Sequence, residues 1–343
     1  GDVYKRQTLY NGNKRLKTIQ QEKLNNQVAE LDVATSENNI QESIAQVYIQ
    51  ILYAAESVKV NESTLQVSIA QRDRGQELLN AGSIAKSDFA QLEAQVSTDR
   101  YQLVTAQATL EDYKLQLKQL LELDGENEMN IYLPALSDEN VLAPLPTKKD
   151  VYIRALSLRP EIEASKLNVE ASELGIGIAK SSYLPTISLS AGIGTNHTSG
   201  SDFTFGEQVK NGWNNSIGLS VSVPIFNNRQ TKSAVQKAKL QYETSMLSLL
   251  DEQKTLYKTI EGLWLDANSA QQRYAAANEK LKSTQISYEL ISEQFNLGMK
   301  NTIELLTEKN NLLQAQQEQL QAKYMAILNM QLLKFYQGDQ LAI

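Results

Sequence analysis

The chain of 343 residues carries 33 basic and 40 acidic side chains and has a net charge of −7 at pH 7. Its basic residues are scattered among the acidic ones, which gives no basic stripe for a phosphate backbone and argues against nucleic-acid binding. The chain has no cysteine, so disulfides, thiolate metal sites and a cysteine nucleophile are excluded. Hydrophobic residues make up 41% of the sequence, but no apolar run approaches the ~18 residues of a transmembrane helix.

The sequence contains itself twice, with the second copy offset by 216 residues (298 − 82 = 216, from Gly82 and Gly298). We therefore predict a first repeat at 1–123, a linker at 124–149 and a second repeat at 150–343. A repeated unit usually cannot bury its apolar face alone, so the two copies are expected to close one core together. Other pairs that match at this offset are Tyr10 and Phe226, Asn11 and Asn227, Lys23 and Lys239, Tyr48 and Trp264, Asp88 and Glu304, and Leu117 and Leu333.

The first repeat is predicted to form two long helices. The segment from Asn13 to about Leu79 is rich in Gln, Glu, Ala, Leu and Lys and has no proline. At ~1.5 Å per residue, one helix of this length spans roughly 100 Å. A turn at 81–83 reverses the chain, and a second helix is expected from Ala85 to about Leu123. Its apolar positions follow a heptad, which calls for a coiled-coil partner. They are Phe89, Leu92, Val96, Leu103, Ala106, Leu110, Leu117 and Leu120, with Asp99 and Tyr113 completing the spacing.

The second repeat begins with a helix predicted from Thr147 to about Ser182. The long helical hairpin then recurs at 228–295 and 302–336, with its turn at 297–299. Asn301 followed by Glu304 resembles a capping box at the start of the last helix. Two adjacent apolar stripes on that helix predict packing on two sides. They are Leu306, Leu313, Leu320 and Ile327, and beside them Leu305, Leu312, Ala326 and Leu333.

The only β-strand pattern lies between these helices, from Pro185 to Pro224. Two runs of about nine residues alternate apolar with small polar side chains, the length and pattern of a strand that crosses a bilayer with lipid on one face and water on the other. The polar segment 195–212 is expected to be an exposed loop. The apolar positions are Ile187, Leu189, Ala191 and Ile193, then Ile217, Leu219, Val221 and Val223. Aromatic residues flank the runs, where an interfacial girdle would lie: Tyr183, Phe203, Phe205, Trp213 and Phe226.

The start of the chain departs from the repeat. Residues 1–7 do not resemble the strand expected before Tyr10, and the chain begins without a methionine or an apolar signal region. We interpret it as a fragment that lacks one transmembrane hairpin, and the alternative that residues 1–7 are not native sequence stays open. Open strand edges cost several kcal/mol per backbone group in hydrocarbon, and even four strands per chain fall short of the ~8 strands of the smallest barrels. An obligate oligomer is therefore expected.

Several short motifs follow one another along residues 8–336. They are Leu-Arg-Pro-Glu-Ile at 158–162, Ala-Lys-Ser-Ser-Tyr-Leu-Pro at 179–185, Val-Pro-Ile-Phe-Asn at 223–227, and the turns at Gly82 and Gly298. Together they resemble the TolC-like outer-membrane efflux family. The resemblance implies a mainly α fold with long antiparallel coiled-coil hairpins in two repeats and a transmembrane β-hairpin. Three such chains would form a twelve-stranded barrel in the outer membrane of a Gram-negative bacterium and a helical tunnel through the periplasm.

The resemblance also implies a function without chemistry. Such channels are exit ducts of tripartite efflux pumps and type I secretion systems, working with an inner-membrane transporter and a periplasmic adaptor. The positions that match the family's gate at the hairpin tips are Asp88, Phe295 in place of a tyrosine, Lys300 in place of an arginine, and Glu304 as an acidic entrance residue. Because Phe295 has no hydroxyl and Thr307 replaces a second acidic residue, a weaker gate and a weaker entrance field are expected. Three Glu304 carboxylates around a threefold axis would form a cation-attracting constriction.

A structural alternative stays open for the same residues. Asp88 and Glu304 are also first-turn acids of the kind that the helix dipole favours. Gly82 and Gly298 are expected to be turn residues, with adaptor contact as a role that the resemblance adds.

Other classes of function are disfavoured. His197 is the only histidine, so a histidine-based triad or a multi-histidine metal site is excluded. The glycines at 175–177 and 192–194 lack the remainder of a phosphate-binding fingerprint, and no cofactor or metal is expected. Two functional alternatives are a periplasmic adaptor protein and a soluble coiled-coil scaffold. The adaptor would have a single hairpin and many short strands, and the scaffold would leave the segment from Pro185 to Pro224 without a role.

Overall fold

The computed structural model describes residues 2–123, 131–132, 141–200 and 202–341. Residues 124–130 and 133–140, most of the predicted linker, lie outside the described residues. The chain divides into two compact units, one formed by Gly1–Thr35 and Arg159–Lys254 and the other by Ser36–Leu158 and Thr255–Ile343. The elements in chain order are β1 (Asp2–Asn11), α1 (Lys14–Asn80), α2 (Lys86–Leu120), α3 (Lys148–Leu158), α4 (Pro160–Lys180), η2 (Ser181–Tyr183), β2 (Thr186–Gly194), α5 (Phe205–Asn211), β3 (Asn214–Ser222), α6 (Gln230–Asn296) and α7 (Thr302–Tyr336).

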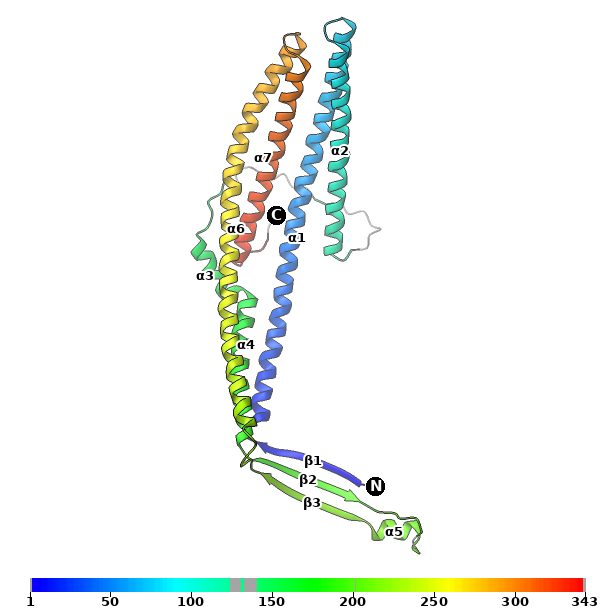
Figure 1. Ribbon diagram of the computed structural model, residues 1–343, viewed down its shortest axis with the longest axis vertical. Helices are drawn as coiled ribbons and strands as arrows, with labels where there is room; N and C mark the ends of the chain where they lie inside the picture. The colour runs from blue at the N-terminus through cyan, green and yellow to red at the C-terminus, as the bar shows by residue number, and fades with distance from the viewer. Residues whose placement is uncertain (1, 124–130, 133–140, 201, 342–343) are drawn as a thin grey trace. The chain divides into compact units, whose positions relative to one another are not determined.

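The first unit contains an antiparallel three-stranded sheet in the order β1-β2-β3 (Figure 1). The predicted pairing of β2 with β3 is confirmed from Thr186 opposite Ser222 to Gly194 opposite Asn214. Directly opposed residues of an antiparallel pair point to the same face, so the apolar positions share one face of the sheet. The opposed apolar pairs are Ile187 with Val221, Leu189 with Leu219, and Ala191 with Ile217. This face is uncovered within the unit, because Ile217 is 84% exposed and Leu219 is 65% exposed.

Strand β1 corrects the prediction that residues 1–7 form no strand and that a whole hairpin of the first repeat is missing. It pairs with β2 from Asp2 opposite Gly194 to Asn11 opposite Thr186, with one irregularity between Thr8 and Tyr10. Residues 3–10, Val-Tyr-Lys-Arg-Gln-Thr-Leu-Tyr, do not alternate apolar with polar side chains, unlike the equally exposed β3. No local pattern therefore marks this strand, and its pairing with β2 defines it. By the offset, residues 2–6 correspond to 218–222 at the end of β3 (2 + 216 = 218). Each strand is followed by a 67-residue helix, and the two strands pair with β2 on its opposite edges.

The predicted loop at 195–212 contains the short helix α5, which the sequence analysis missed. The Thr204 side chain accepts a hydrogen bond from the Glu207 backbone N–H, and the Glu207 carboxylate accepts one from the Thr204 N–H at 2.9 Å. This is a capping box, and its Thr-x-x-Glu pattern is visible in the sequence.

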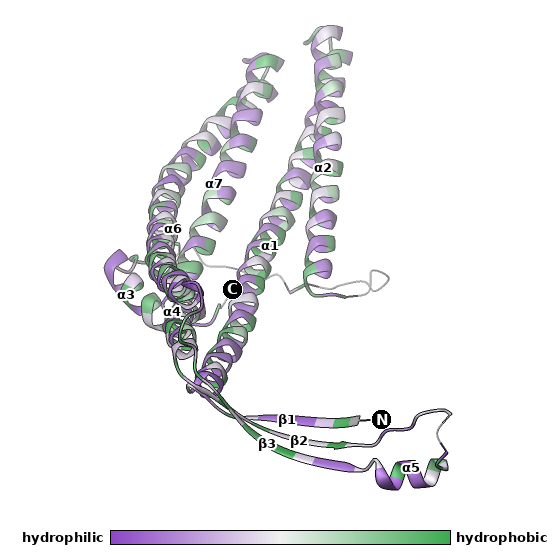
Figure 2. Cartoon of the chain, turned by 60° about the horizontal axis from the view of Figure 1, so that its bottom comes forward, coloured by the Kyte–Doolittle hydropathy of each residue, from purple (hydrophilic) through white to green (hydrophobic). Residues whose placement is uncertain are grey.

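The two long helical hairpins repeat at the predicted offset. Helices α1 and α6 each have 67 residues, α2 and α7 each have 35, and their first residues differ by 216 (230 − 14 and 302 − 86). The strand-to-helix junctions repeat as well: Gly12 and Asn13 have φ values of 66° and 63°, and Asn228 and Arg229 have 50° and 60°. Figure 2 shows hydrophilic and hydrophobic residues interspersed along α1 and α6. Among the described residues, every helix is too short or too polar to cross a membrane.

The helix predicted from Thr147 to Ser182 is instead two helices followed by a 3-10 turn. Helix α3 ends at Leu158 and α4 begins at Pro160, while Arg159 between them is extended, with φ −74° and ψ 125°. Proline has no N–H for the helical ladder and disfavours helical conformation at the preceding residue. The chain therefore breaks at Arg159, whose buried side chain pairs with Glu161 at 2.9 Å.

The core of the second unit is formed by α1, α6 and α7. Its cluster includes Ile49 and Leu52 from α1, Tyr274 from α6, and Ala326 and Ile327 from α7. The two predicted stripes of the last helix are confirmed as packing positions, since Leu305, Leu312, Leu313, Ala326, Ile327 and Leu333 are buried and Leu306 and Leu320 are half-buried. In α2, Leu92, Val96, Asp99 and Leu117 are buried, and Phe89, Leu103, Ala106, Leu110, Tyr113 and Leu120 are half-buried.

Candidate functional site

The tips of the two hairpins have the same turn geometry. Gly82 has φ +72° and Gly298 has φ +73°, a left-handed conformation that glycine adopts without steric cost. The Gly82 N–H donates to the Leu79 carbonyl at 2.9 Å, and the Gly298 N–H donates to the Phe295 carbonyl at 2.9 Å. Both glycines are open to solvent, since a Cβ added to either would meet no atom within 4 Å. The turn role is therefore confirmed, while adaptor contact stays a prediction.

Asp88 and Glu304 cap the helices that follow these turns. The Asp88 carboxylate accepts the Ala85 N–H at 3.3 Å, and because Ala85 has no side-chain acceptor the capping is one-sided. In the second copy the box is complete: the Asn301 side chain accepts the Glu304 N–H at 2.9 Å, and the Glu304 carboxylate accepts the Asn301 N–H at 3.2 Å. Both acidic side chains therefore accept a hydrogen bond from the backbone at the start of their helices, as the structural alternative predicts. Their role in the gate stays a prediction.

Glu304 also forms an ion pair with Lys300. The Lys300 Nζ lies 2.5 Å from Oε1 of Glu304. The hydrogen bond from Lys300, and then the backbone hydrogen bond from Asn301, lower the pKa of Glu304. The carboxylate is therefore held in its charged form next to the hairpin tip. Among the described residues, no hydrogen bond or ion pair joins Asp88 to Lys300 or Glu304, so the fold brings two of the three predicted charged residues together and leaves the third apart.

Phe295 lies in an apolar cluster and not in a polar network. It is 2% exposed and packs with Leu92 of α2 and Leu305 of α7, which are 1% and 0% exposed. Tyr288 and Leu78 lie against the same cluster. Phe295, which stands where the family resemblance implies a tyrosine, thus forms part of an apolar contact between the two hairpins near their tips.

A buried polar cluster below the tips was missed by the sequence analysis. Lys309 of α7 contacts both Asp99 of α2 and Ser68 of α1, and these three side chains are 3%, 1% and 2% exposed. Ser68 also donates to Asp99, and Gln95 donates to the second Asp99 oxygen at 2.9 Å. Burial lowers the pKa of Lys309, and the hydrogen bond with Asp99 opposes that effect.

This cluster breaks the symmetry of the repeat. At the offset of 216, Asp99 corresponds to Ala315, Ser68 to Thr284, and Lys309 to Glu93. Each hairpin supplies one charge, and neither copy can form the contact by itself. The signal in the sequence was Asp99 itself, because a carboxylate at a heptad core position requires a buried partner.

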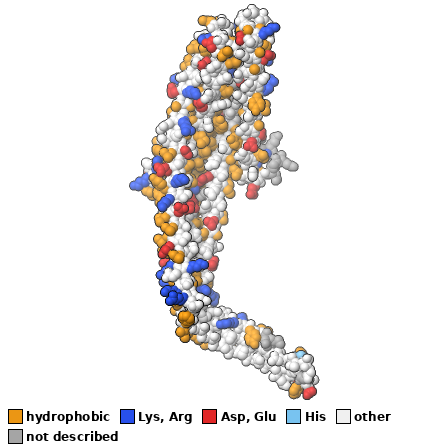
Figure 3. All heavy atoms as spheres, viewed as in Figure 1, with side chains coloured by type: hydrophobic (Ala, Val, Ile, Leu, Met, Phe, Trp, Pro, Cys, Tyr) orange, Lys and Arg blue, Asp and Glu red, His pale blue; other side chains and the backbone are white. Residues whose placement is uncertain are grey.

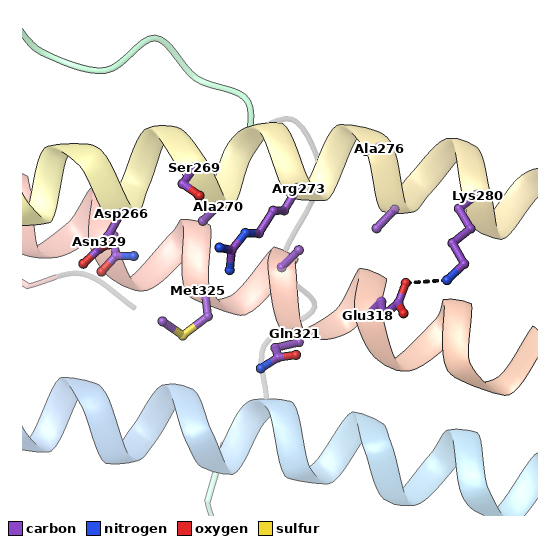
Figure 4. Close-up of a pocket in the computed structure, with 12 residues that line it drawn as sticks. Asp266, Ser269, Ala270, Arg273, Ala276, Lys280, Glu318, Gln321, Met325 and Asn329 are labelled. Atoms are coloured by element: carbon purple, nitrogen blue, oxygen red, sulfur yellow. Dashed lines mark hydrogen bonds and ion pairs between the residues drawn. The ribbon is translucent and has the colours of Figure 1, made fainter.

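A groove of about 540 Å³ runs along α6 and α7 (Figure 4). Its residues include Arg273, Met325 and the ion pair of Lys280 with Glu318, whose charged atoms are 2.7 Å apart. Within the described parts of the chain, no cluster of histidine and acidic side chains has the composition of a metal site. The predicted interface aromatics Tyr183, Trp213 and Phe226 are 52%, 56% and 84% exposed and stand at the ends of the strands, where their membrane role stays a prediction.

Comparison with known proteins identifies relatives over most of the chain. Residues 151–338 match the family described as outer membrane efflux protein. The outer membrane protein TolC of Escherichia coli is 23% identical over 88% of this chain and 62% of its own length. The outer membrane efflux protein BepC of Brucella suis is 24% identical over 84% of this chain and 60% of its own length. The chain therefore spans less than two thirds of these relatives.

The fold is also shared with a solved channel. The crystal structure of the Campylobacter jejuni CmeC outer membrane channel superposes on all of this chain and 71% of its own, with a TM-score of 0.80 and 19% identity. The chain therefore shares its fold with that channel protein.

Proposed function

The chain belongs to the outer membrane efflux protein family, and we propose that the whole protein is a subunit of an outer-membrane channel that conducts substrates out of a Gram-negative cell. The conduit would serve a tripartite efflux pump or a type I secretion system. It would act passively, with no bond made or broken by the protein itself.

The observation that carries this proposal is the sheet of the first unit. Across β2 and β3 one face is apolar and exposed, while the other carries small polar residues such as Ser188, Ser190 and Ser220. In β1, Gln7 and Lys5 lie opposite Leu189 and Ala191, so the apolar face is a property of the β2–β3 pair. β1 and β3 are edge strands, and open edges are not tolerated in hydrocarbon. A sheet with a lipid-facing side must therefore be closed by further strands, and other copies of the chain are the simplest source.

We propose a homotrimer with a shared barrel and a helical tunnel. The three strands that the structure describes fall short of the ~8 strands of the smallest bacterial barrels. The helices support the same assembly, because large apolar side chains such as Leu247 and Leu265 of α6 remain 66% and 52% exposed in the single chain. Side-by-side contact between copies would cover such surfaces.

The tunnel entrance would lie at the hairpin tips. Three copies of Glu304 would form an acidic ring, with Lys300 holding each carboxylate in place. Phe295 and the buried contact of Asp99 with Lys309 would keep the two hairpins of one chain together in the closed state. We propose that Gly82 and Gly298 present the tips to a periplasmic adaptor, which would connect the channel to an inner-membrane transporter.

The proposal is tested with the complete gene product. Expressed in a Gram-negative host, it should be recovered from outer membranes only with detergent, run as a cross-linkable trimer, and produce discrete conductance steps in planar bilayers. Recovery from the soluble periplasm without detergent would contradict the channel and favour the adaptor or scaffold alternatives.

A further inference from the structure

Basic side chains gather where the long helices meet the sheet. Three segments lie at these junctions: 12–23 at the start of α1, 170–185 at the end of α4 and beyond, and 227–240 at the start of α6. They contain nine basic residues and three acidic residues, Glu22, Glu170 and Glu173, a net charge of +6 (9 − 3), whereas the whole chain carries −7. We name the nine residues the basic collar: Lys14, Arg15, Lys17, Lys23, Lys180, Arg229, Lys232, Lys237 and Lys239.

The three segments are far apart in sequence but start from one end of the sheet. Asn11 pairs with Thr186, and Thr186 pairs with Ser222, so the chain enters or leaves all three strands at this end. Helices α1 and α4 are packed together there, since the Gln21 side chain donates to the Ala171 carbonyl at 2.8 Å. Figure 3 shows blue side chains concentrated on the visible face at this junction. The fold therefore brings basic residues from three distant segments of the sequence to the same end of the sheet.

No contact within the described chain neutralises the collar. Eight of its nine side chains are exposed, and Lys17 is half-buried. In the residues that the structure describes, none of the nine forms an ion pair, although such pairs occur elsewhere along the helices. Nine like charges near one end of the sheet repel one another. An anionic partner outside the chain would relieve this repulsion.

The collar borders exposed apolar side chains on its sheet side. Ile225 is 96% exposed, Phe226 is 84% exposed and Tyr183 is 52% exposed, and all three lie between the strands and the helices. In membrane proteins, aromatic side chains gather at the membrane interface, and Lys and Arg beside them reach the charged headgroups. The side chains between the sheet and the basic collar follow this order. A shallow groove of about 420 Å³ in α6 combines both properties, because it is lined by Arg229, Lys232, Ser233, Gln236, Lys237 and Leu240.

We propose that the basic collar binds the phosphate groups of anionic phospholipids in the membrane leaflet from which the helices emerge. The inference rests on the proposed function, since it takes the sheet as the part that lies in the bilayer. Basic residues near an anionic surface are attracted to it, and salt screens this attraction. The collar would therefore fix the depth of the channel in the membrane at the level of the helix junctions.

The test compares two triple variants of the complete gene product. Lys14→Gln/Lys180→Gln/Lys232→Gln removes one exposed charge from each junction, and Lys149→Gln/Lys258→Gln/Lys282→Gln removes three exposed lysines elsewhere. Native mass spectrometry of protein purified with phosphatidylglycerol and phosphatidylcholine counts the retained lipids. Wild type and control are expected to retain a several-fold excess of phosphatidylglycerol, and the collar variant, which keeps six of the nine charges (9 − 3), should retain a clearly smaller excess.

Three results would overturn the inference: an unchanged lipid ratio in the collar variant, an equal loss in both variants, or a preference that survives high salt. A collar variant with an unchanged lipid ratio but altered ion selectivity would assign the charges to the pore. Conductance of the same preparations in planar bilayers separates the two proposals. If the wild type forms pores but shows no lipid preference, the channel proposal holds and the lipid-binding proposal is wrong. If the wild type forms no pores, the channel proposal itself is wrong.

Discussion

Among single residues, Asp99 and Lys309 have the strongest mutual dependence. Both are almost fully buried, and each is the only opposite charge with which the other forms an ion pair in the described residues. Asp99→Asn would leave the Lys309 ammonium uncompensated, and breaking such a buried pair typically costs ~3–5 kcal/mol. We expect a clearly lower Tm for the purified protein, measured by circular dichroism on heating.

The control for this prediction is the exposed pair of Lys280 and Glu318, whose side chains are 46% and 42% exposed. Glu318→Gln should change stability by only ~0–1 kcal/mol. The double variant Asp99→Leu/Lys309→Met removes both buried charges and should recover most of the lost stability. If Asp99→Asn and Glu318→Gln shift the Tm equally, the buried cluster does not hold the hairpins together.

Glu304 provides a pH dependence at the proposed entrance. Its contacts with Lys300 and the Asn301 N–H lower its pKa below the ordinary 4.5. A depressed carboxyl pKa means that the contact is fully present above 4.5 and is lost as the pH falls through the lowered value. Cation selectivity, measured as the reversal potential in planar bilayers, should therefore stay constant as the pH falls to 4.5. It should decline at lower pH, as the pH falls through the lowered pKa of Glu304.

Glu304→Gln is the matched variant for this measurement. It removes the charge at every pH, so its selectivity should be lower than wild type at neutral pH and should lack the acidic decline. If the cation selectivity of the wild type already falls at pH values well above the ordinary carboxyl pKa, groups other than Glu304 set the electric field at the entrance.

At the scale of elements, the hairpin turns can be tested with two glycines that differ only in backbone conformation. Gly298 has φ +73°, Gly262 lies in the interior of α6, and an added Cβ meets no atom within 4 Å at either position. Gly298→Ala should cost ~1–2 kcal/mol because alanine disfavours the left-handed region. Gly262→Ala should stabilise the helix by ~0.5–1 kcal/mol. Hydrogen exchange of the tip amides should accelerate in the first variant alone, and equal exchange in both would contradict a turn fixed by its φ angle.

Elements whose pattern is local could be predicted from the sequence. The long helices, the turns at Gly82 and Gly298 and the capping box of Asn301 with Glu304 follow from composition, glycine positions and short-range hydrogen bonds. Strand β1 could not be predicted, because its residues do not alternate apolar with polar side chains and its partner β2 is more than 170 positions away (186 − 11 = 175). The break at Arg159 was predictable from Pro160, but it was missed because the residues on both sides of it favour a helix.

The candidate site shows the same division between local and long-range information. The pair of Lys300 with Glu304 lies four positions apart on one helix, where side chains meet by geometry alone. The contact of Asp99 with Lys309 joins residues 210 positions apart, so no local pattern specifies it. The basic collar likewise depends on three chain segments that only the sheet register brings to one end.

At the scale of the whole molecule, the two faces of the sheet should meet different solvents in the assembled channel. Leu219 and Ser220 are neighbours in β3, are both exposed in the single chain, and point to opposite faces because side chains alternate along a strand. These 343 residues contain no cysteine, so a single introduced cysteine is the only thiol among them.

We expect Ser220→Cys to react with a water-soluble maleimide that enters the pore, and Leu219→Cys to react only with a maleimide that partitions into lipid. The reactions are measured in membranes and again after the protein is unfolded in denaturant, where both cysteines should react fully. Because the two positions differ by one residue, unequal labelling depends on the face and not on the depth of the site. If both cysteines react equally with the water-soluble reagent in membranes, the apolar face does not lie against lipid, and the sheet is not the wall of a closed barrel.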